Sequence, residues 1–296
     1  MELLVFDVGG SHITGALCNA EALRLSARES VPLDAQGTED DFYSAIHSLS
    51  SQILRNQGME VGNVDGMSFA FPGPFDYDEG ISLVKHKFAA LYGKSLRTAL
   101  ASRFGPQPAQ IQFVNDADAF LLGELSQLPH ARQGKTIGIT LGTGVGSAFA
   151  IEGKIVHRGP GIPLQGEIWN LPWSGGILEG AISTRAIQSA YEKRTRQQRS
   201  VREIAERSQA DTDAATVLKN FGITLGDALR SVAAPFQPKT IIFGGAISRS
   251  AELFLPHTAE RFGEGSRLLV STLFEDAALY GAAVHWKQAS PRAMKI

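Results

Sequence analysis

The sequence contains two short apolar strands, well over a hundred residues apart, and each runs directly into a glycine-rich turn. The first covers residues 3–11, LLVFDVGGS, and the second covers residues 136–147, TIGITLGTGVGS. Each turn continues into another apolar stretch, so each segment predicts a β-hairpin with glycine at its tip. Glycine lets backbone N–H groups approach a ligand closely, and successive N–H groups bind phosphate well. The pair therefore predicts a chain that holds a polyphosphate between two halves.

Composition excludes several classes of protein. A chain of 296 residues suffices for one large or two ordinary domains. A formal net charge of -2 and the lack of a Lys/Arg block argue against a nucleic-acid partner. The apolar N-terminal run ends at Phe6, too early for a signal peptide or a membrane-spanning helix. Cys18 is the only cysteine, so we expect neither an intrachain disulfide nor a cysteine-based zinc site. Together these properties predict a cytoplasmic protein without a membrane partner.

The segments around the hairpins predict mixed sheets flanked by helices. Thr38 is expected to start a helix, with Asp41 completing a capping box. Further expected strands lie near 23–31, 64–71, 111–114, 240–243 and 268–270, and further helices cover 95–104, 116–128, most of 179–234, and 276–286. Residues 158–178, rich in Gly, Pro and Trp, predict an ordered loop. The repeated hairpin favours an α/β protein of two related domains that face a central cleft.

The two turns carry the first candidate ligand groups. Asp7 could hold Mg²⁺ beside phosphates, directly or through water, although aspartate is also common in ordinary turns. Because Gly9 follows it closely and a second turn matches it, we favour the metal role. Gly142, Thr143 and Gly144 offer N–H groups and a hydroxyl to phosphates, whereas a tight hairpin alone needs fewer glycines.

Three further segments carry residues that could contact a substrate or a nucleotide, and most of these residues also have a purely structural explanation. Asp116, at a strand-to-helix junction, could accept a proton from an attacking alcohol, or it could simply cap the helix. Glu167 and Glu179 flank a stretch rich in tryptophan and could accept hydrogen bonds from sugar hydroxyls; Glu179 could equally be a first-turn carboxylate. Gly244 and Gly245 follow a buried strand and could lie against an adenosine or form a plain turn.

Taken in order, these segments resemble the ROK family of sugar kinases, within the actin/hexokinase/Hsp70-like ATPase fold. The resemblance runs nearly from end to end. It rests on five motifs: VFDVGGSHI at 5–13, AFPGP at 70–74, VNDADA at 114–119, LGTGVGS at 141–147 and IFGGAIS at 242–248. It implies a two-domain, ribonuclease H-like fold with a small domain over 1–115 and a large one over 116–296. A C-terminal helix near 280–296 would pack back on the small domain.

The resemblance also implies roles for single residues. Asp116 would be the catalytic base, and Asn115, Glu167, Asn170 and Glu179 would contact the sugar. Nucleotide and metal contacts would come from both turns and the adenosine-side motif, namely Asp7, Gly9, Gly10, Ser11, Gly142, Thr143, Gly144, Gly244 and Gly245. ATP and Mg²⁺ would be the cofactors, and a homodimer is the assembly seen in many relatives.

The chain departs from the family pattern at several substrate positions. Asn170 replaces the histidine of the family motif G-E-x-G-H, and the cysteine cluster C-x-C-G-x-x-G-C is absent, so no zinc is expected. Lys87 lies in the segment 85–88, where relatives place a sugar-binding asparagine. Asp118 replaces an asparagine, as in some polyphosphate-using relatives, so polyphosphate stays open as a donor.

Three other functions compete with a sugar kinase. A sugar-responsive regulator would carry a DNA-binding domain ahead of the first hairpin, and we expect no room for one before residue 3. A non-catalytic sugar sensor remains open because Asn170 and Lys87 alter the substrate positions. A protein that only hydrolyses ATP would leave Asn115, Asp116 and Glu167 unexplained.

Overall fold

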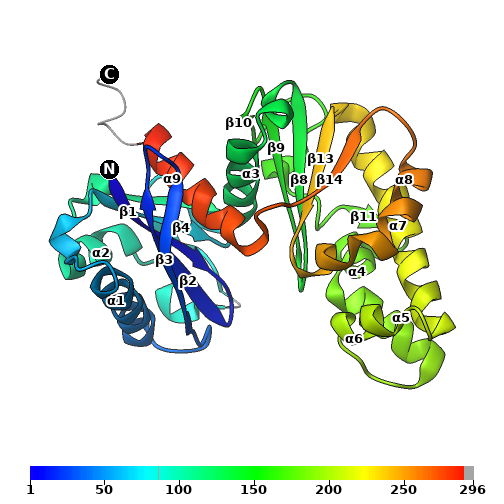
Figure 1. Cartoon of the computed structure of the whole chain (residues 1–296), viewed down its shortest axis with the longest axis horizontal. Helices are drawn as coiled ribbons and strands as arrows, with labels where there is room; N and C mark the ends of the chain where they lie inside the picture. Colours follow the sequence, from blue (N-terminus) through cyan, green and yellow to red (C-terminus); the bar gives the residue numbers. More distant parts are fainter. Residues whose placement is uncertain (86, 290–296) are drawn as a thin grey trace. The chain divides into compact units, whose positions relative to one another are not determined.

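The structure is a computed structural model that describes residues 1–85 and 87–289 (Figure 1). The chain divides into two compact units, one formed by 1–127 together with the segment from Glu275 onward, and one formed by 128–274. The expected small domain ended at Asn115, whereas the first unit continues through the helix that starts at Asp116. This helix stays with the first unit because it packs closely against the C-terminal helix. The expected end of that C-terminal helix, 290–296, lies outside the described residues.

The first unit is built on a mixed sheet in the order β3-β2-β1-β4-β7. Strands β1, β2 and β3 are antiparallel neighbours, and β4 and β7 continue the sheet in parallel from β1. Its elements are β1 (Glu2–Val8), β2 (His12–Asn19), β3 (Arg24–Pro32), α1 (Glu39–Arg55), η1 (Val61–Asn63), β4 (Gly66–Phe71), β5 (Phe75–Asp76), β6 (Ile81–Ser82), η2 (Ala89–Leu91), α2 (Leu96–Phe104), η3 (Pro108–Gln110), β7 (Ile111–Asn115), α3 (Asp116–Gln127) and α9 (Ala277–Ala289).

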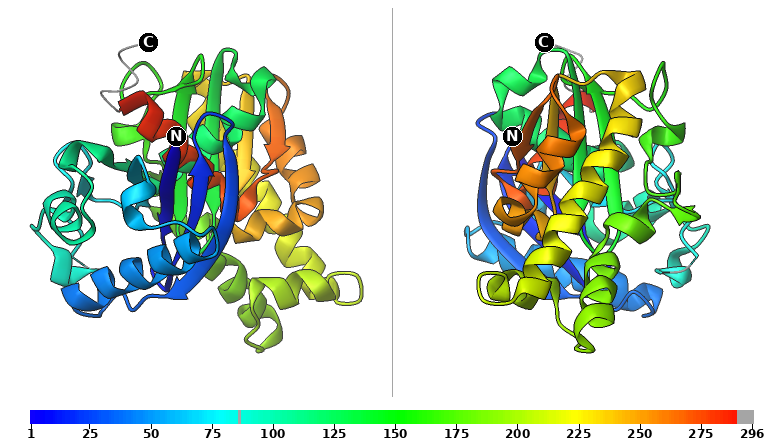
Figure 2. Two further views of the ribbon diagram at one scale, coloured as in Figure 1. Left: turned by 60° about the vertical axis from the view of Figure 1, so that its left-hand side comes forward. Right: turned by 90° about the vertical axis from the view of Figure 1, so that its right-hand side faces the viewer.

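Helix α1 covers one face of this sheet, below the blue strands in the left view of Figure 2. The predicted capping box starts it, since Thr38 and Asp41 exchange side-chain to backbone bonds. Side chains alternate along β1, so Leu4 and Phe6 join the core that α1 completes. Phe6 stacks on Phe69 of β4, with ring centroids 4.6 Å apart. The predicted helix after Thr38 and the predicted strands that form this core are thus confirmed.

Helices α3 and α9 cover the opposite face of the sheet, and they pack against each other at a glycine in each helix. A Cβ on Gly281 would lie 1.7 Å from the carbonyl oxygen of Ala119, and one on Gly123 would lie 1.9 Å from that of Ala277. Ser68 of β4 adds a buried hydrogen bond of 2.7 Å to the carbonyl oxygen of Ala282. The first unit therefore includes α3 because two helix backbones meet without intervening side chains.

The second unit repeats the same sheet plan in the order β10-β9-β8-β13-β14. Strands β8, β9 and β10 are antiparallel neighbours, whereas β13 and β14 continue in parallel from β8. Its elements are η4 (Pro129–Arg132), β8 (Lys135–Leu141), β9 (Val145–Ile151), β10 (Lys154–Ile155), η5 (Leu164–Gly166), β11 (Pro172–Trp173), β12 (Gly176–Ile177), α4 (Glu179–Ile182), α5 (Thr184–Thr195), α6 (Val201–Arg207), α7 (Thr212–Phe236), β13 (Thr240–Gly244), η6 (Ala246–Leu253), α8 (Leu255–Phe262), β14 (Arg267–Val270) and, at the unit boundary, η7 (Phe274–Asp276).

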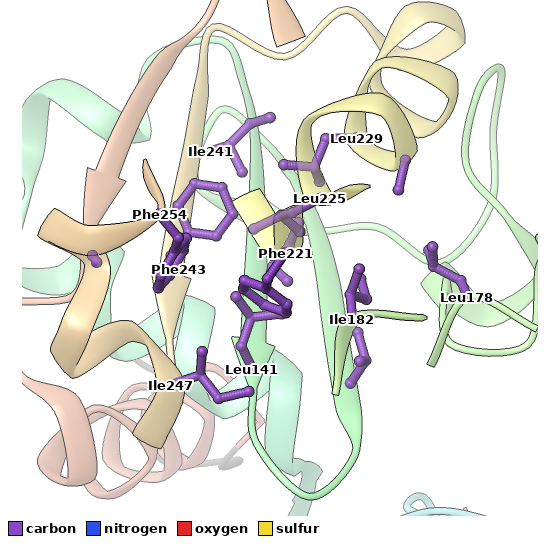
Figure 3. Packing of buried hydrophobic residues seen from close by; sticks show 14 of the residues in the cluster. Leu141, Leu178, Ile182, Phe221, Leu225, Leu229, Ile241, Phe243, Ile247 and Phe254 are labelled. Atoms are coloured by element: carbon purple, nitrogen blue, oxygen red, sulfur yellow. The ribbon is translucent and has the colours of Figure 1, made fainter. Parts of the chain in front are cut away.

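A long apolar helix closes the core of the second unit. Figure 3 shows Phe221, Leu225 and Leu229 of α7 beside Leu141 of β8 and Phe243 of β13. The right view of Figure 2 shows α7, in yellow, along this sheet. The repeated plan confirms the α/β class with mixed sheets. Sequence patterns missed only short elements, among them the β5–β6 hairpin and the β11–β12 hairpin inside the predicted loop.

The α3–α9 crossing makes a stability prediction. Gly281→Ala should lower the free energy of unfolding by roughly 3 kcal/mol or more, because the added Cβ forces two helix backbones apart. Chemical denaturation measures the change. Gly62→Ala is the matched control, since a Cβ there meets nothing within 4 Å, and it should stay within about 0.5 kcal/mol of the parent. Equal stability of the two variants would contradict the close crossing.

Candidate functional site

Asp7 lies one residue before the end of β1, the central strand of the first sheet. It pairs with Thr14 of β2 on one side and Ala70 of β4 on the other, so its place on the sheet is well determined. The pKa of Asp7 is raised from 3.8 to about 7, first by burial and then by the nearby Asp116 carboxylate, while Arg28 partly offsets this rise. Part of the Asp7 side chain remains accessible, yet the protein atoms around its carboxylate exclude much of the water that would stabilise its charge.

The first glycine tip follows Asp7 and is closed by a backbone bond. The N–H of Gly9 donates to the carbonyl oxygen of His12 over 3.0 Å. Gly10 is exposed, and a Cβ placed on it would meet no atom within 4 Å. The hydroxyl of Ser11 lies 3.2 Å from Nδ1 of His12. The open part of this tip therefore consists of Gly10 and Ser11, while the N–H of Gly9 is used within the turn.

Asn115 caps helix α3. Its Oδ1 accepts hydrogen bonds from the N–H groups of Ala117 at 2.9 Å and Asp118 at 3.3 Å. Its Nδ2 donates to the hydroxyl of Tyr77 over 3.1 Å, and that hydroxyl donates to the carbonyl oxygen of Phe71. The alternative in which Asp116 is the cap is therefore wrong, because Asn115 sits one residue before the helix. The predicted sugar contact of Asn115 would have to use the remaining capacity of its amide.

Asp116 is the first residue of α3, and its side chain reaches solvent. Protein atoms around the carboxylate still raise its pKa by desolvation, and Asp118 adds repulsion. Lys87 and a 2.9 Å bond from the N–H of Ala117 lower the pKa, but the balance is upward. Asp7 and Asp116 thus form a pair of carboxylates close enough to repel each other. Next to Lys87, His86 of the sequence motif lies outside the described residues.

The second glycine tip, in the second unit, joins β8 to β9. The N–H of Gly142 donates to the carbonyl oxygen of Gly144 over 3.0 Å, and the carbonyl oxygen of Gly142 accepts from the N–H of Thr184 over 2.8 Å. Thr143 is exposed, and within the described part of the chain no group accepts from its N–H or from that of Gly144. These two amides are therefore open to a ligand, whereas that of Gly142 is used in the turn.

Glu179, the first residue of α4, contacts this tip. Its Oε2 accepts the N–H of Val145 over 3.0 Å. A Cβ on Gly144 would lie 2.9 Å from the same oxygen, so a side chain at this position would displace the carboxylate. The sequence offered no sign of this contact, because Glu179 and Gly144 are joined only by the fold.

The loop that carries Glu167 is also bound to the second hairpin. The buried hydroxyl of Ser147 donates to the carbonyl oxygen of Gly166 over 2.6 Å and accepts the N–H of Ile168 over 3.1 Å. The indole of Trp169 donates to Oε2 of Glu167 over 3.0 Å, and the exposed Asn170 follows it. No pattern in the sequence identified Ser147 as the residue that holds this loop.

Gly244 and Gly245 end β13. Gly245 has a positive φ of 80°, and a Cβ on it would lie 2.4 Å from the carbonyl oxygen of Leu141. The hydroxyl of Ser248 donates to the carbonyl oxygen of Gly244 over 2.7 Å. Close packing on the end of β8 thus accounts for Gly245 by itself, and the adenosine contact stays a prediction.

The structure places the predicted residues in two groups. The first unit holds Asp7, Asn115 and Asp116 together with the first glycine tip, and the second unit holds the second tip with Glu167, Asn170, Glu179 and Gly244. Among the described residues, no group of three or more His, Cys, Asp or Glu side chains could hold a metal. No helix among residues 1–85 and 87–289 is both long and apolar enough to span a bilayer.

Comparisons with known proteins agree with this arrangement. Residues 4–289 match the model of the ROK family. Glucokinase of Thermotoga maritima is 26% identical over 315 residues, which cover 96% of this chain and 96% of that protein. N-acetyl-D-glucosamine kinase of Vibrio parahaemolyticus is 24% identical over 265 residues, 82% of this chain and 83% of that protein.

A solved structure shows the same fold. The ROK family glucokinase from Streptomyces griseus, in complex with glucose and AMPPNP, superposes with a TM-score of 0.79 at 21% identity. The match covers 97% of this chain and 100% of that one. The predicted actin-like ATPase fold is thereby confirmed.

The raised pKa of Asp7 predicts how stability depends on pH. The folded protein binds more protons than the unfolded chain between about pH 4 and pH 7, because the folded pKa is near 7 and the unfolded one near 3.8. Stability is therefore lost as pH rises through this window. Asp7→Asn stays neutral and should be more stable than the parent above pH 7, by on the order of 1–2 kcal/mol.

Urea unfolding between pH 5 and pH 8, without metal or nucleotide, measures this difference. The advantage of Asp7→Asn should grow with pH and level off near pH 8. Asp40→Asn, at an exposed carboxylate, controls for the loss of one charge. An advantage that is constant across the range would contradict a raised pKa at Asp7.

Proposed function

Because the chain belongs to the ROK family, we propose that it is an ATP-dependent kinase that phosphorylates a hydroxyl of a hexose or related sugar. Its curated relatives include a glucokinase and an N-acetyl-D-glucosamine kinase, so glucose and N-acetylglucosamine are the first acceptors to test. A glucokinase of the same fold binds glucose together with AMPPNP. The family pattern and the exposed carboxylate of Asp116 together support transfer to a sugar.

The observation that carries the proposal is that Asn115, and not Asp116, caps helix α3. Asn115 takes the helix cap, so the Asp116 carboxylate is left free of that structural task. Its raised pKa makes it a better proton acceptor than an ordinary aspartate. In this role Asp116 accepts the hydrogen bond of the attacking hydroxyl and takes its proton late, since the transition state of phosphoryl transfer is loose.

Asp7 is suited to hold Mg²⁺, directly or through water. The two carboxylates of Asp7 and Asp116 repel each other, and a divalent cation between phosphates and carboxylate would relieve that repulsion. Magnesium sites commonly combine one or two carboxylates with substrate phosphates and water, so a larger cluster of protein ligands is not needed. When bound, the ion neutralises negative charge on the phosphates.

The glycine tips of both units and the loop of Glu167 supply the remaining contacts in this proposal. The open amides of Thr143 and Gly144 are suited to the β- and γ-phosphates. Glu167 and Asn170, on the loop bound to Ser147, would contact sugar hydroxyls together with Glu179. The other nucleotide contacts would come from the first tip and the end of β13, namely Gly9, Gly10, Ser11, Gly142, Gly244 and Gly245.

A panel of acceptors and donors tests the function. Purified protein with Mg²⁺ and ATP should phosphorylate glucose, N-acetylglucosamine or another hexose, measured by coupled ADP release and by mass of the product. Polyphosphate replaces ATP in a second arm, because Asp118 leaves the donor open. Tight binding of one sugar without phosphorylation by either donor would instead establish the sugar sensor that Asn170 and Lys87 suggest. ATP hydrolysis that no sugar accelerates would contradict both the sugar kinase and the sugar sensor.

Asp116→Asn tests the catalytic base. The variant should lower kcat at least 10²–10³-fold, since the amide cannot accept the proton. Sugar affinity by calorimetry should stay within about threefold of the parent, and Asn115 should keep α3 capped. A variant that retains more than a tenth of the parent kcat would remove Asp116 from this role.

A further inference from the structure

Glu179 has two carboxylate oxygens, and the structure uses one of them inside the protein. Oε2 accepts the N–H of Val145, the first residue of β9, over 3.0 Å. The same oxygen packs against Gly144, where a Cβ would come within 2.9 Å. Hydrogen bonds in which one partner is charged are about twice as strong as neutral ones. This bond therefore holds the turn at the residue that follows its open amides.

The backbone around Glu179 ties the same turn to the sugar loop. The N–H of Glu179 donates to the carbonyl oxygen of Trp169 over 2.9 Å, and the N–H of Thr184 donates to Gly142 over 2.8 Å. Helix α4 thus lies between the loop of Glu167 and the tip of the second hairpin. The Glu179 side chain is half-buried, so its second oxygen can reach a ligand.

We propose that Glu179 is a positioning residue for the phosphate-binding turn, in addition to any contact with the sugar. Its Oε2 orients the amides of Thr143 and Gly144 toward the donor phosphates, while Oε1 is left for a sugar hydroxyl. A side chain at position 144 would then push the Glu179 carboxylate away from Val145. This role rests on the proposed kinase function, and it predicts that Glu179 affects nucleotide binding even when no sugar is present.

The test measures affinity for Mg²⁺·AMPPNP without sugar, by calorimetry, in the parent and in substituted proteins. Glu179→Ala should weaken binding about tenfold or more, since the charge-assisted hydrogen bond to Val145 is lost. Glu179→Gln keeps an oxygen that accepts from Val145 but lacks the charge, so it should weaken nucleotide binding clearly less than Glu179→Ala does. Its KM for sugar should rise by a larger factor than its loss of nucleotide affinity.

Glu167→Ala is the matched control, because Glu167 bonds to Trp169 and not to the turn. It should leave AMPPNP affinity within about twofold of the parent. If Glu179→Ala does not fold, Glu179→Asp keeps the charge but cannot reach Val145, and it should show the tenfold loss. Equal AMPPNP affinities of Glu179→Ala and the parent would refute this role alone. Absence of AMPPNP binding by the parent would refute the proposed function and this role with it.

Discussion

The candidate site depends on one backbone constraint. The N–H groups of a buried strand need hydrogen-bond partners, and the sheet supplies these partners only as far as the strand extends. In both units the central strand pairs in antiparallel fashion with one neighbour and in parallel with the other, so both sides of its backbone have hydrogen-bond partners within the sheet. Past the last residue of each strand the chain turns back at glycine, and one amide of each tip closes the turn. The amides next to it are left open at the edge of a rigid sheet.

The two sheets then differ in what they place beside their tips. The first unit places Asp116 close enough to raise the pKa of Asp7, an arrangement that favours a cation and a proton acceptor. The second unit places a carboxylate, Glu179, as an acceptor behind the open amides. The proposed reaction would therefore use the negative charge of the two carboxylates in the first unit. In the second unit it would use the open backbone N–H groups beside Glu179.

The parts of the fold that sequence predicted best are those with local causes. The capping box of Thr38 and Asp41 lies within four residues, so it could be predicted before the helix was seen. Hairpins and apolar periodicity are equally local. The helix cap at Asn115 was missed because Asn115 and Asp116 are both good capping residues, and only the backbone shows which of them precedes the first turn.

Patterns in the sequence alone identify the α/β class, the two glycine tips, the family, and the residues from which a site could be built. These follow from patterns within about ten residues, or from motifs in a set order. Three contacts became known only from the folded chain: Glu179 accepts the N–H of Val145, Gly245 packs on Leu141, and α3 joins the first unit through Gly123 and Gly281. Each of these contacts joins residues far apart in the chain, and it depends on distances between backbones that no local pattern encodes.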